Sequence, residues 1–314
     1  LDGLDAHSIS FQVKDYKKTN SITMELKGML RRDFNDFNYL LNENLWGPNE
    51  DLEANKYNSI LSIKLRHKYE YLFGKGKIDI DLRSSSWLSD YNFSTLSLTS
   101  LNKNNLFGLD IKTRVFAQAG FGKNFPIENM LFSAGANPEK MMDYTLTRSA
   151  GLISKENADY GIGTNHFHLG GGLNLRGYVG DYMQENIGQQ TANTYYGTTG
   201  ISMNIEISYI NYLKSIMPNY RIFRFLNRLP IDSYLFYDIG VINNNGFEDK
   251  VSFGSLKSDL GIGLTCDLSE IIDEYYNTDK PLILRFDFPI FLSDPPSSEN
   301  NLKLRWLFGI NKSF

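Results

Sequence analysis

Residues 200–209 read Gly-Ile-Ser-Met-Asn-Ile-Glu-Ile-Ser-Tyr, and this stretch decides the fold. From Ile201 to Tyr209 every second position is apolar, and serine, asparagine and glutamate fill the positions between them. Side chains of a β-strand point alternately to its two faces, so a period of two predicts a strand with one apolar face and one polar face.

The same alternation occurs in eleven segments of the chain, six before residue 120 and five after residue 198. Repeated alternation without helical periodicity predicts an all-β protein of antiparallel strands. The segments are 9–13, 22–26, 61–65, 78–82, 96–98, 109–115, 200–209, 231–241, 256–268, 282–290 and 302–314.

The composition excludes several classes of protein. The chain has 314 residues and a formal net charge of −4, which excludes a nucleic-acid binder that relies on bulk basicity. No stretch approaches the ~18 apolar residues of a transmembrane helix. Cys266 is the single cysteine, so an internal disulfide and a multi-cysteine metal site are excluded. Cys266 lies among the alternate apolar positions of its segment, which predicts a packing role rather than a nucleophile.

Two architectures produce such alternation. A soluble sandwich or barrel buries the apolar faces in its core, whereas a membrane barrel turns them to lipid and lines its lumen with polar groups. Long strands, charged and glycine-rich polar faces, and aromatic residues near strand ends favour the membrane barrel. The two architectures place four residues differently: Leu260, Ile262, Trp306 and Phe308. A membrane barrel would turn these side chains to lipid, whereas a sandwich would bury them in a dry core.

The lengths of the links between strands predict an orientation. Tight links at 17–20 and 103–105 alternate with long polar links at 33–55 and 120–198. Short periplasmic turns and long extracellular loops are typical of outer-membrane barrels. Two links on the expected periplasmic side, 213–229 and 269–280, are longer than this pattern.

Five motifs follow one another in the second half of the chain. Gly171 and Gly172 precede the tetrapeptide Leu175-Arg176-Gly177-Tyr178. An aromatic-x-Asp-x-Gly strand (235–240), a Gly-x-Gly strand (258–264), a strand at 281–290 and a closing strand ending in Phe314 follow. This order resembles the barrel of the BamA/TamA/two-partner-secretion transporter superfamily of bacterial outer-membrane insertases and translocators.

The resemblance implies one domain, 1–314, a transmembrane antiparallel β-barrel whose long extracellular loop, 120–198, folds inward. The family barrel has sixteen strands and eleven are readable here. Either upstream strands are absent from this chain or further strands lie within 120–165. The family's periplasmic polypeptide-binding (POTRA) repeats are not readable in this sequence.

The resemblance also implies a site inside the lumen. In the family, the arginine of the tetrapeptide contacts acidic residues on neighbouring strand interiors. Asp238 and Glu206 lie on the polar parity of their strands, so we expect Arg176 to pair with Asp238, with Glu206 as the second candidate. Asp287 and Arg285 are expected to join them. The alternative is that Arg176 is a solvated loop residue.

The end of the chain resembles the C-terminal signal of outer-membrane barrels. Trp306, Phe308 and Ile310 occupy alternate positions, and the sequence ends in Phe314. The resemblance implies that the assembly machinery recognises this segment.

No enzyme motif emerges, and we predict no enzyme activity, cofactor or metal. The glycines at 161–163 and 170–172 lack a following Lys-Ser/Thr pair and a helix pattern, and His166 and His168 lack a third metal ligand. The predicted function is insertion or translocation of proteins at the outer membrane. The alternatives are a porin-like channel or the membrane anchor of a fused periplasmic enzyme. The expected partners are the bilayer with its lipopolysaccharide, unfolded outer-membrane or secreted polypeptide, and periplasmic domains or accessory subunits, with no nucleic acid.

Overall fold

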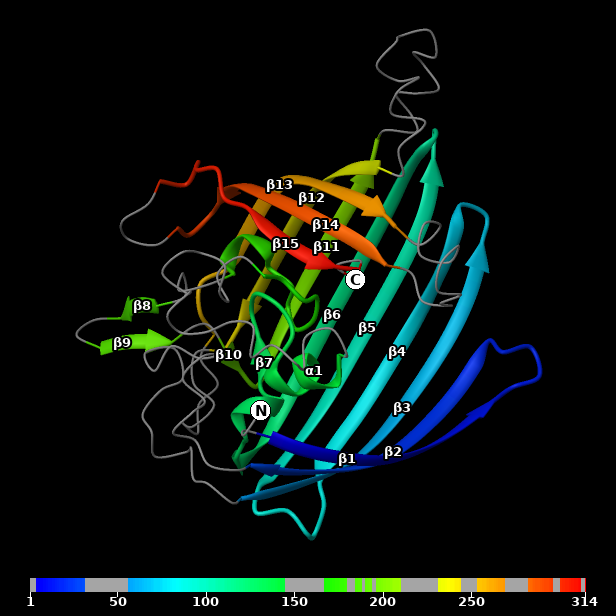
Figure 1. The fold of residues 1–314 in the computed structure, drawn as a ribbon, viewed down its shortest axis with the longest axis vertical. Coiled ribbons are helices and arrows are strands. Elements are labelled where there is room, and N and C mark those ends of the chain that lie inside the picture. Colours follow the sequence, from blue (N-terminus) through cyan, green and yellow to red (C-terminus); the bar gives the residue numbers. More distant parts are fainter. Residues whose placement is uncertain are drawn as a thin grey trace, which may run out of the picture.

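A computed structural model describes residues 4–31, 56–144, 167–179, 184–187, 190–193, 196–209, 231–243, 253–268, 282–295, 300–311 and 314. Eleven antiparallel strands form one curved sheet in the order β1-β2-β3-β4-β5-β6-β11-β12-β13-β14-β15 (Figure 1). The strands are β1 (Leu4–Lys14), β2 (Asn20–Arg31), β3 (Tyr57–Tyr71), β4 (Gly74–Ser85), β5 (Asn92–Leu106), β6 (Leu109–Asn124), β11 (Gly200–Ser208), β12 (Ile231–Ile242), β13 (Lys257–Asp267), β14 (Ile283–Leu292) and β15 (Leu307–Ile310).

The all-β prediction is confirmed, with six strands before the long link and five after it. Within the described residues β1 and β15 are the two ends of the sheet and do not pair with each other. Residues 145–165, one of the places where further strands were expected, lie outside the described residues, as do the links at 33–55, 213–229 and 269–280.

The faces of the strands have the arrangement of a membrane barrel. Along β11 the serine, asparagine and glutamate side chains are buried, whereas Ile201 and Met203 are exposed. Leu260 is 47% exposed, Trp306 is 42% exposed and Ile262 also faces outward. An apolar outer face around a polar interior is the inverse of a soluble sandwich, so the sandwich alternative is wrong. Among the described residues, no helix has the length and hydrophobicity needed to cross a membrane.

One tight link lies elsewhere than the sequence predicted. Residues 103–105 belong to β5, and the chain turns at Phe107 and Gly108. Both have positive φ, 53° and 81°. A two-residue hairpin of this kind needs positive φ at both positions, and glycine adopts it without strain.

The closing strand is shorter than predicted. Only 307–310 of the expected 302–314 form β15, and residues 303 and 305 make irregular backbone bonds to β14. The register of β13 with β14 also shifts between Leu260 and Gly261, and Gly261 lies opposite Pro289. Just after β15, Asn311 has a φ of 68°. The ring of Phe314 lies 5.9 Å from the guanidinium of Arg176, not on the outer face with Trp306.

The inward segment, residues 125–144 and 167–179, lies inside the curve of the sheet (Figure 1). It begins later than the expected residue 120 because β6 continues to Asn124. Leu173 and Leu175 donate their N–H groups to Phe132 and Ser133, and their side chains are buried. The elements of the link are η4 (Ile127–Asn129), β7 (Leu131–Phe132), α1 (Pro138–Asp143), η5 (Arg176–Tyr178), β8 (Gln184–Ile187), β9 (Gln190–Asn193) and β10 (Tyr196–Gly197).

Candidate functional site

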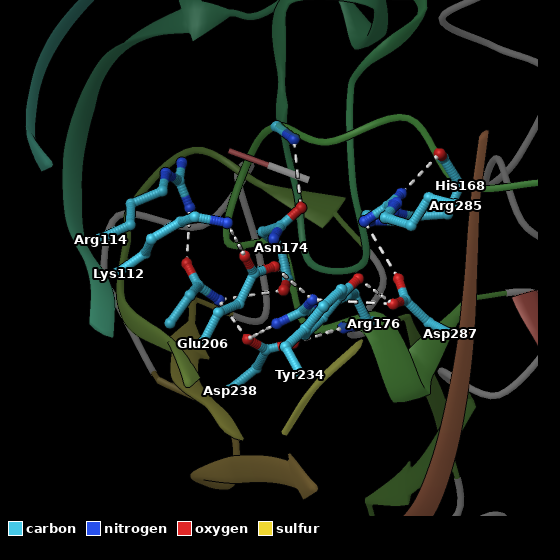
Figure 2. A network of polar contacts seen from close by, with 12 residues as sticks. Lys112, Arg114, His168, Asn174, Arg176, Glu206, Tyr234, Asp238, Arg285 and Asp287 are labelled. Carbon is cyan, nitrogen blue, oxygen red and sulfur yellow. Dashed lines mark hydrogen bonds and ion pairs between the residues drawn. The ribbon is translucent and has the colours of Figure 1, made fainter. Parts of the chain in front are cut away.

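Arg176 lies at the centre of a buried ion network inside the sheet (Figure 2). Its side chain is fully buried, and it donates from Nε and Nη2 to the two carboxylate oxygens of Asp238 at 2.7 and 3.0 Å. Nη1 donates to Glu206 Oε1 at 2.8 Å. The guanidinium also lies 3.9 Å from the ring centre of Phe236. Two carboxylates and an aromatic face thus hold one cation rigidly.

The backbone around Arg176 requires the neighbouring glycines. Gly172 has a φ of 54°, and a Cβ there would collide with the carbonyl oxygens of Phe132 and Gly135. Gly177 packs against Asp259 and Leu292, so a side chain would push η5 away from β13 and β14. Tight backbone approach is a use for which glycine is suited. The motif therefore places Arg176 against the polar inner face of β11 and β12.

Leu175 and Tyr178 complete the packing of the motif. Leu175 belongs to a buried apolar cluster together with Leu292 and Leu307. Tyr178 is buried, and its hydroxyl donates to the carbonyl of Ser258 at 3.2 Å and accepts the N–H of Asp294 at 3.2 Å. These contacts attach η5 to strands β13 and β14.

Asp287 and Arg285 lie beside the network rather than at its centre. Asp287 Oδ1 is 4.0 Å from Arg176 Nη1, and Asp287 Oδ2 is 3.0 Å from Arg285 Nη1. The hydroxyl of Tyr234 donates to Asp287. Arg285 also donates to the Nδ1 and the carbonyl oxygen of His168 in the inward segment. The network therefore continues from β11 to β14.

Arg114 and Asn204 are network residues that the sequence reasoning missed. Arg114 donates to Asn204 Oδ1 at 2.8 Å and to the carbonyl of Gly172 at 2.7 Å. Asn204 Nδ2 donates to Asp238 Oδ1 at 3.0 Å and to the carbonyl of Asn174 at 3.0 Å. Both share the polar parity of their strands, so the alternation alone was a signal that could have found them.

A second network, the Glu139 network, binds α1 to the opposite part of the sheet. Glu139 accepts from Arg83 of β4 at 2.6 and 2.8 Å, from Asn129 at 2.6 Å, and lies 3.0 Å from Lys27 of β2. Lys27 also binds Asp143 at 2.6 Å. No period in residues 134–144 pointed to Glu139, because the segment is irregular apart from one short helix.

Burial and charge set the ionisation of the inward segment. Burial alone would lower the pKa of Arg176, but Asp238 and Glu206 hold that pKa well above its usual value. Burial lowers the pKa of His168 well below its usual value, and the charges of Arg285 and Arg176 act in the same direction. Burial raises the pKa of Glu139, yet Arg83 and Lys27 outweigh it and bring the pKa to about 2. We therefore treat His168 as neutral and Glu139 as ionised.

A cavity of about 810 Å³ lies at the end of the sheet where β3–β4 and β5–β6 turn. Lys75, Lys103 and Asp232 line it, and Glu206 and Arg285 of the Arg176 network form part of its wall. Within the described residues no group of three or more His, Cys, Asp or Glu side chains is arranged to hold a metal ion. His166 lies outside the described residues.

The remaining predicted residues lie in the C-terminal segment. Trp306 faces outward, and the ring of Phe308 contacts Phe167 edge-on at 5.2 Å between centroids. Ile310 ends β15 half-buried. Their recognition by an assembly machinery stays a prediction.

Comparisons with known proteins were made for the sequence and for the fold. No family model and no curated protein matches the sequence. Among solved structures, the chain is similar to BamA from Haemophilus ducreyi lacking POTRA domains 1-3, with a TM-score of 0.46 and 12% identity over 97% of this chain and 53% of that chain. It is also similar to a BenF-like porin from Pseudomonas fluorescens Pf-5, with a TM-score of 0.41 and 9% identity over 98% of this chain and 57% of that chain.

The chain spans little more than half the length of these two structures. Its own geometry carries the conclusion about its architecture: eleven antiparallel strands with exposed apolar and buried polar faces, wrapped around an inward segment. The protein is an all-β, barrel-type fold with a membrane-facing outer surface.

Proposed function

We propose that the protein is a bacterial outer-membrane barrel of the BamA-type superfamily that inserts or translocates polypeptides. The single observation that carries the proposal is the contact of Arg176 with Asp238 and Glu206. The tetrapeptide by which the sequence resembles the superfamily thus lies against the polar interior of the sheet. The resemblance implies this arrangement for the family, and a solvated loop would not produce it.

The proposed mechanism uses the weak end of the sheet. β15 shares four register pairs with β14, whereas β5 and β6 share fifteen. Residues 301, 303, 305 and 311 add single backbone bonds to the β14 segment. Separating the last strand therefore breaks fewer backbone bonds than separating β5 from β6 would. The Arg176 network would hold β11, β12 and η5 together during this separation. The proposed partners are the bilayer with its lipopolysaccharide, an unfolded outer-membrane or secreted polypeptide, and accessory periplasmic domains. We propose no nucleic-acid partner and no enzyme activity.

The cavity at the turn end favours a second candidate, a porin-like channel. Charged side chains from β3–β6 and from β11–β14 line it, as a path for small polar solutes would require. A channel would have to continue past Arg176, whose network borders the cavity. Anchoring of a fused periplasmic enzyme is the third arrangement that the fold would serve.

The test is reconstitution of the protein into liposomes of outer-membrane lipids. A small urea-unfolded barrel substrate is added, and its folded, heat-modifiable form is followed on gels over time. We expect wild-type liposomes to fold the substrate faster than empty liposomes, and Arg176→Ala to lose this acceleration. Single-channel conductance is recorded from the same preparation.

Lys123→Gln is the matched control, because Lys123 lies exposed at the far end of β6. This variant should fold the substrate like the wild type. Steady conductance without acceleration would favour the channel and contradict insertion. Equal acceleration by Arg176→Ala would contradict the role of the network.

A further inference from the structure

β15 ends the main sheet, and a piece of the inward segment covers its second edge. The N–H groups of Arg305 and Asn311 donate to Pro289 and Ile283 of β14, so odd-numbered residues direct their backbone groups toward β14. Even-numbered Phe308 directs its groups the other way, since successive residues of a strand alternate. There the carbonyl of Phe308 accepts the N–H of His168 at 2.8 Å.

Residues 167 and 168, which we call the cap, lie on this edge like a very short added strand. Phe167 forms a parallel bridge with Phe308, and the two rings contact edge-on. Phe167 is half-exposed, whereas the side chain of His168 is buried. The cap thus repeats the alternation of the strands, with an apolar residue next to a polar, inward-facing one.

Arg285 fastens the cap from the far side of β15. Its Nη2 donates to the carbonyl of His168 at 3.1 Å and to the imidazole Nδ1 (Figure 2). Gly309 lies between them: a Cβ there would lie 2.5 Å from Arg285 Nη2 and 2.7 Å from the His168 carbonyl oxygen. The absence of a side chain at 309 lets β14 reach across β15 to the cap.

The described contacts of the cap with the edge are few. They comprise one backbone bond, one ring pair and the Arg285 bonds. Within the inward segment, His168 is also hydrogen-bonded to Ala134 and Asn174, and the N–H of Ala136 donates to the carbonyl of Leu169 at 2.9 Å. A typical hydrogen bond contributes only about 1 kcal/mol net. A competing strand that forms more backbone bonds with β15 would therefore displace the cap.

We propose that the cap is a built-in competitor that occupies the docking edge of β15, and that an extended polypeptide strand of alternating apolar and polar residues is the partner that replaces it. Strand addition to an open sheet edge obtains affinity from backbone bonds and selectivity from alternate side chains. The inference deepens the proposed insertion role and rests on it, because it names what controls access to the last strand.

The first experiment locks the cap. In a Cys266→Ser background, Phe167→Cys and Phe308→Cys are combined, since bridged residues of neighbouring strands bring their Cβ atoms within reach of a disulfide. The probe is a fluorescent peptide of residues 164–170, whose binding to the detergent-solubilised protein is followed by anisotropy. We expect the oxidised protein to lose peptide binding and the reduced protein to bind it.

The second experiment loosens the cap. Gly309→Ala and Arg285→Gln should each tighten peptide binding by about tenfold. Both variants weaken the cap, and the apparent affinity of the peptide rises with the fraction of molecules whose β15 edge is uncapped. Gly240→Ala is the matched control. It also adds a methyl group at a closely packed glycine, but this glycine lies in β12, away from the cap. Gel mobility before and after heating confirms that each variant is folded, and Gly309→Ala removes no charge.

The results separate the cap from the insertion role. Failure of the disulfide to form, or equal peptide binding by the wild type, Gly309→Ala and the oxidised protein, would overturn the cap. If the disulfide and the loosening variants change peptide binding as expected, but the protein does not accelerate substrate folding, the proposed role of the cap stands and the insertion role is contradicted.

Discussion

The two walls of the sheet, β2–β6 and β11–β14, have lumen-facing charges of opposite sign, and the inward segment binds each wall with the opposite charge. The first wall carries ten basic and five acidic side chains: Lys27, Lys64, Arg66, Lys68, Lys75, Lys77, Arg83, Lys103, Lys112 and Arg114 against Glu25, Glu70, Asp79, Asp81 and Asp110. The second carries six acidic and two basic side chains: Glu206, Asp232, Asp238, Asp259, Asp267 and Asp287 against Lys257 and Arg285.

The inward segment complements this division. Its Glu139 binds Lys27 and Arg83 on the basic wall, and its Arg176 binds Asp238 and Glu206 on the acidic wall. A segment with its charges exchanged would meet like charges on both walls. Charge, rather than apolar packing alone, therefore determines which part of the segment lies against which wall.

The largest effect is expected at the acidic wall. Arg176→Ala leaves Asp238 buried without its bidentate cation and leaves Glu206 with Lys112 alone, at 3.4 Å. Breaking a buried ion pair in this way costs about 3–5 kcal/mol. We expect a marked fall in the temperature at which half of the protein loses its folded gel mobility. Arg176→Lys should recover only part of the loss, since an ammonium cannot replace the bidentate contact. If Arg176→Ala loses its folded gel mobility at the same temperature as the wild type, the contact of Arg176 with the acidic wall does not stabilise the protein.

A smaller effect is expected at the basic wall. Glu139→Gln removes the charge that Lys27 and Arg83 share, but Lys27 keeps Asp143. We expect a loss of about 1–3 kcal/mol. Hydrogen exchange should quicken in 127–143 and remain slow in 173–179 if the two attachments are independent. Combined with Arg176→Ala the losses should then add; a large interaction energy would show that the walls are coupled.

Acid should test the same attachment without a mutation. The pKa of Glu139 falls from 4.5 to about 2 in the folded protein. A lowered carboxyl pKa stabilises the folded state fully above 4.5, and this contribution is lost as the pH falls through about 2. Exchange protection of 127–143 should therefore persist at pH 4 and decline near pH 2. Its loss already at pH 4.5 would contradict the pairing.

The smallest effect is expected from a half-exposed pair on the basic wall. Arg66 donates from Nε and Nη2 to the two carboxylate oxygens of Asp79 at 2.6 and 3.0 Å, but about a third of the Arg66 side chain is exposed. Solvent screens such pairs, so Arg66→Ala should cost about 0.5–1 kcal/mol. A loss as large as that of Arg176→Ala would show that burial does not separate the two pairs.

Much of the fold was predictable because alternation reports directly which face of a strand is apolar. The same parity put Asp238 and Glu206 on the lumen side, where the structure has them bound to Arg176. The rest depends on features without a period. Glu139 lies in an irregular segment, Asn311 has a single positive φ just after β15, and the register of β13 with β14 shifts opposite Pro289.

The covered edge of β15 also bears on how copies of the protein meet one another. An open strand edge offers unpaired backbone groups to any neighbouring chain and is a common origin of self-association. Because His168 already occupies the carbonyl of Phe308, that position is withheld from a second copy. Crowding in the plane of a membrane should therefore produce fewer edge-to-edge adducts while Phe167 and His168 stay in place.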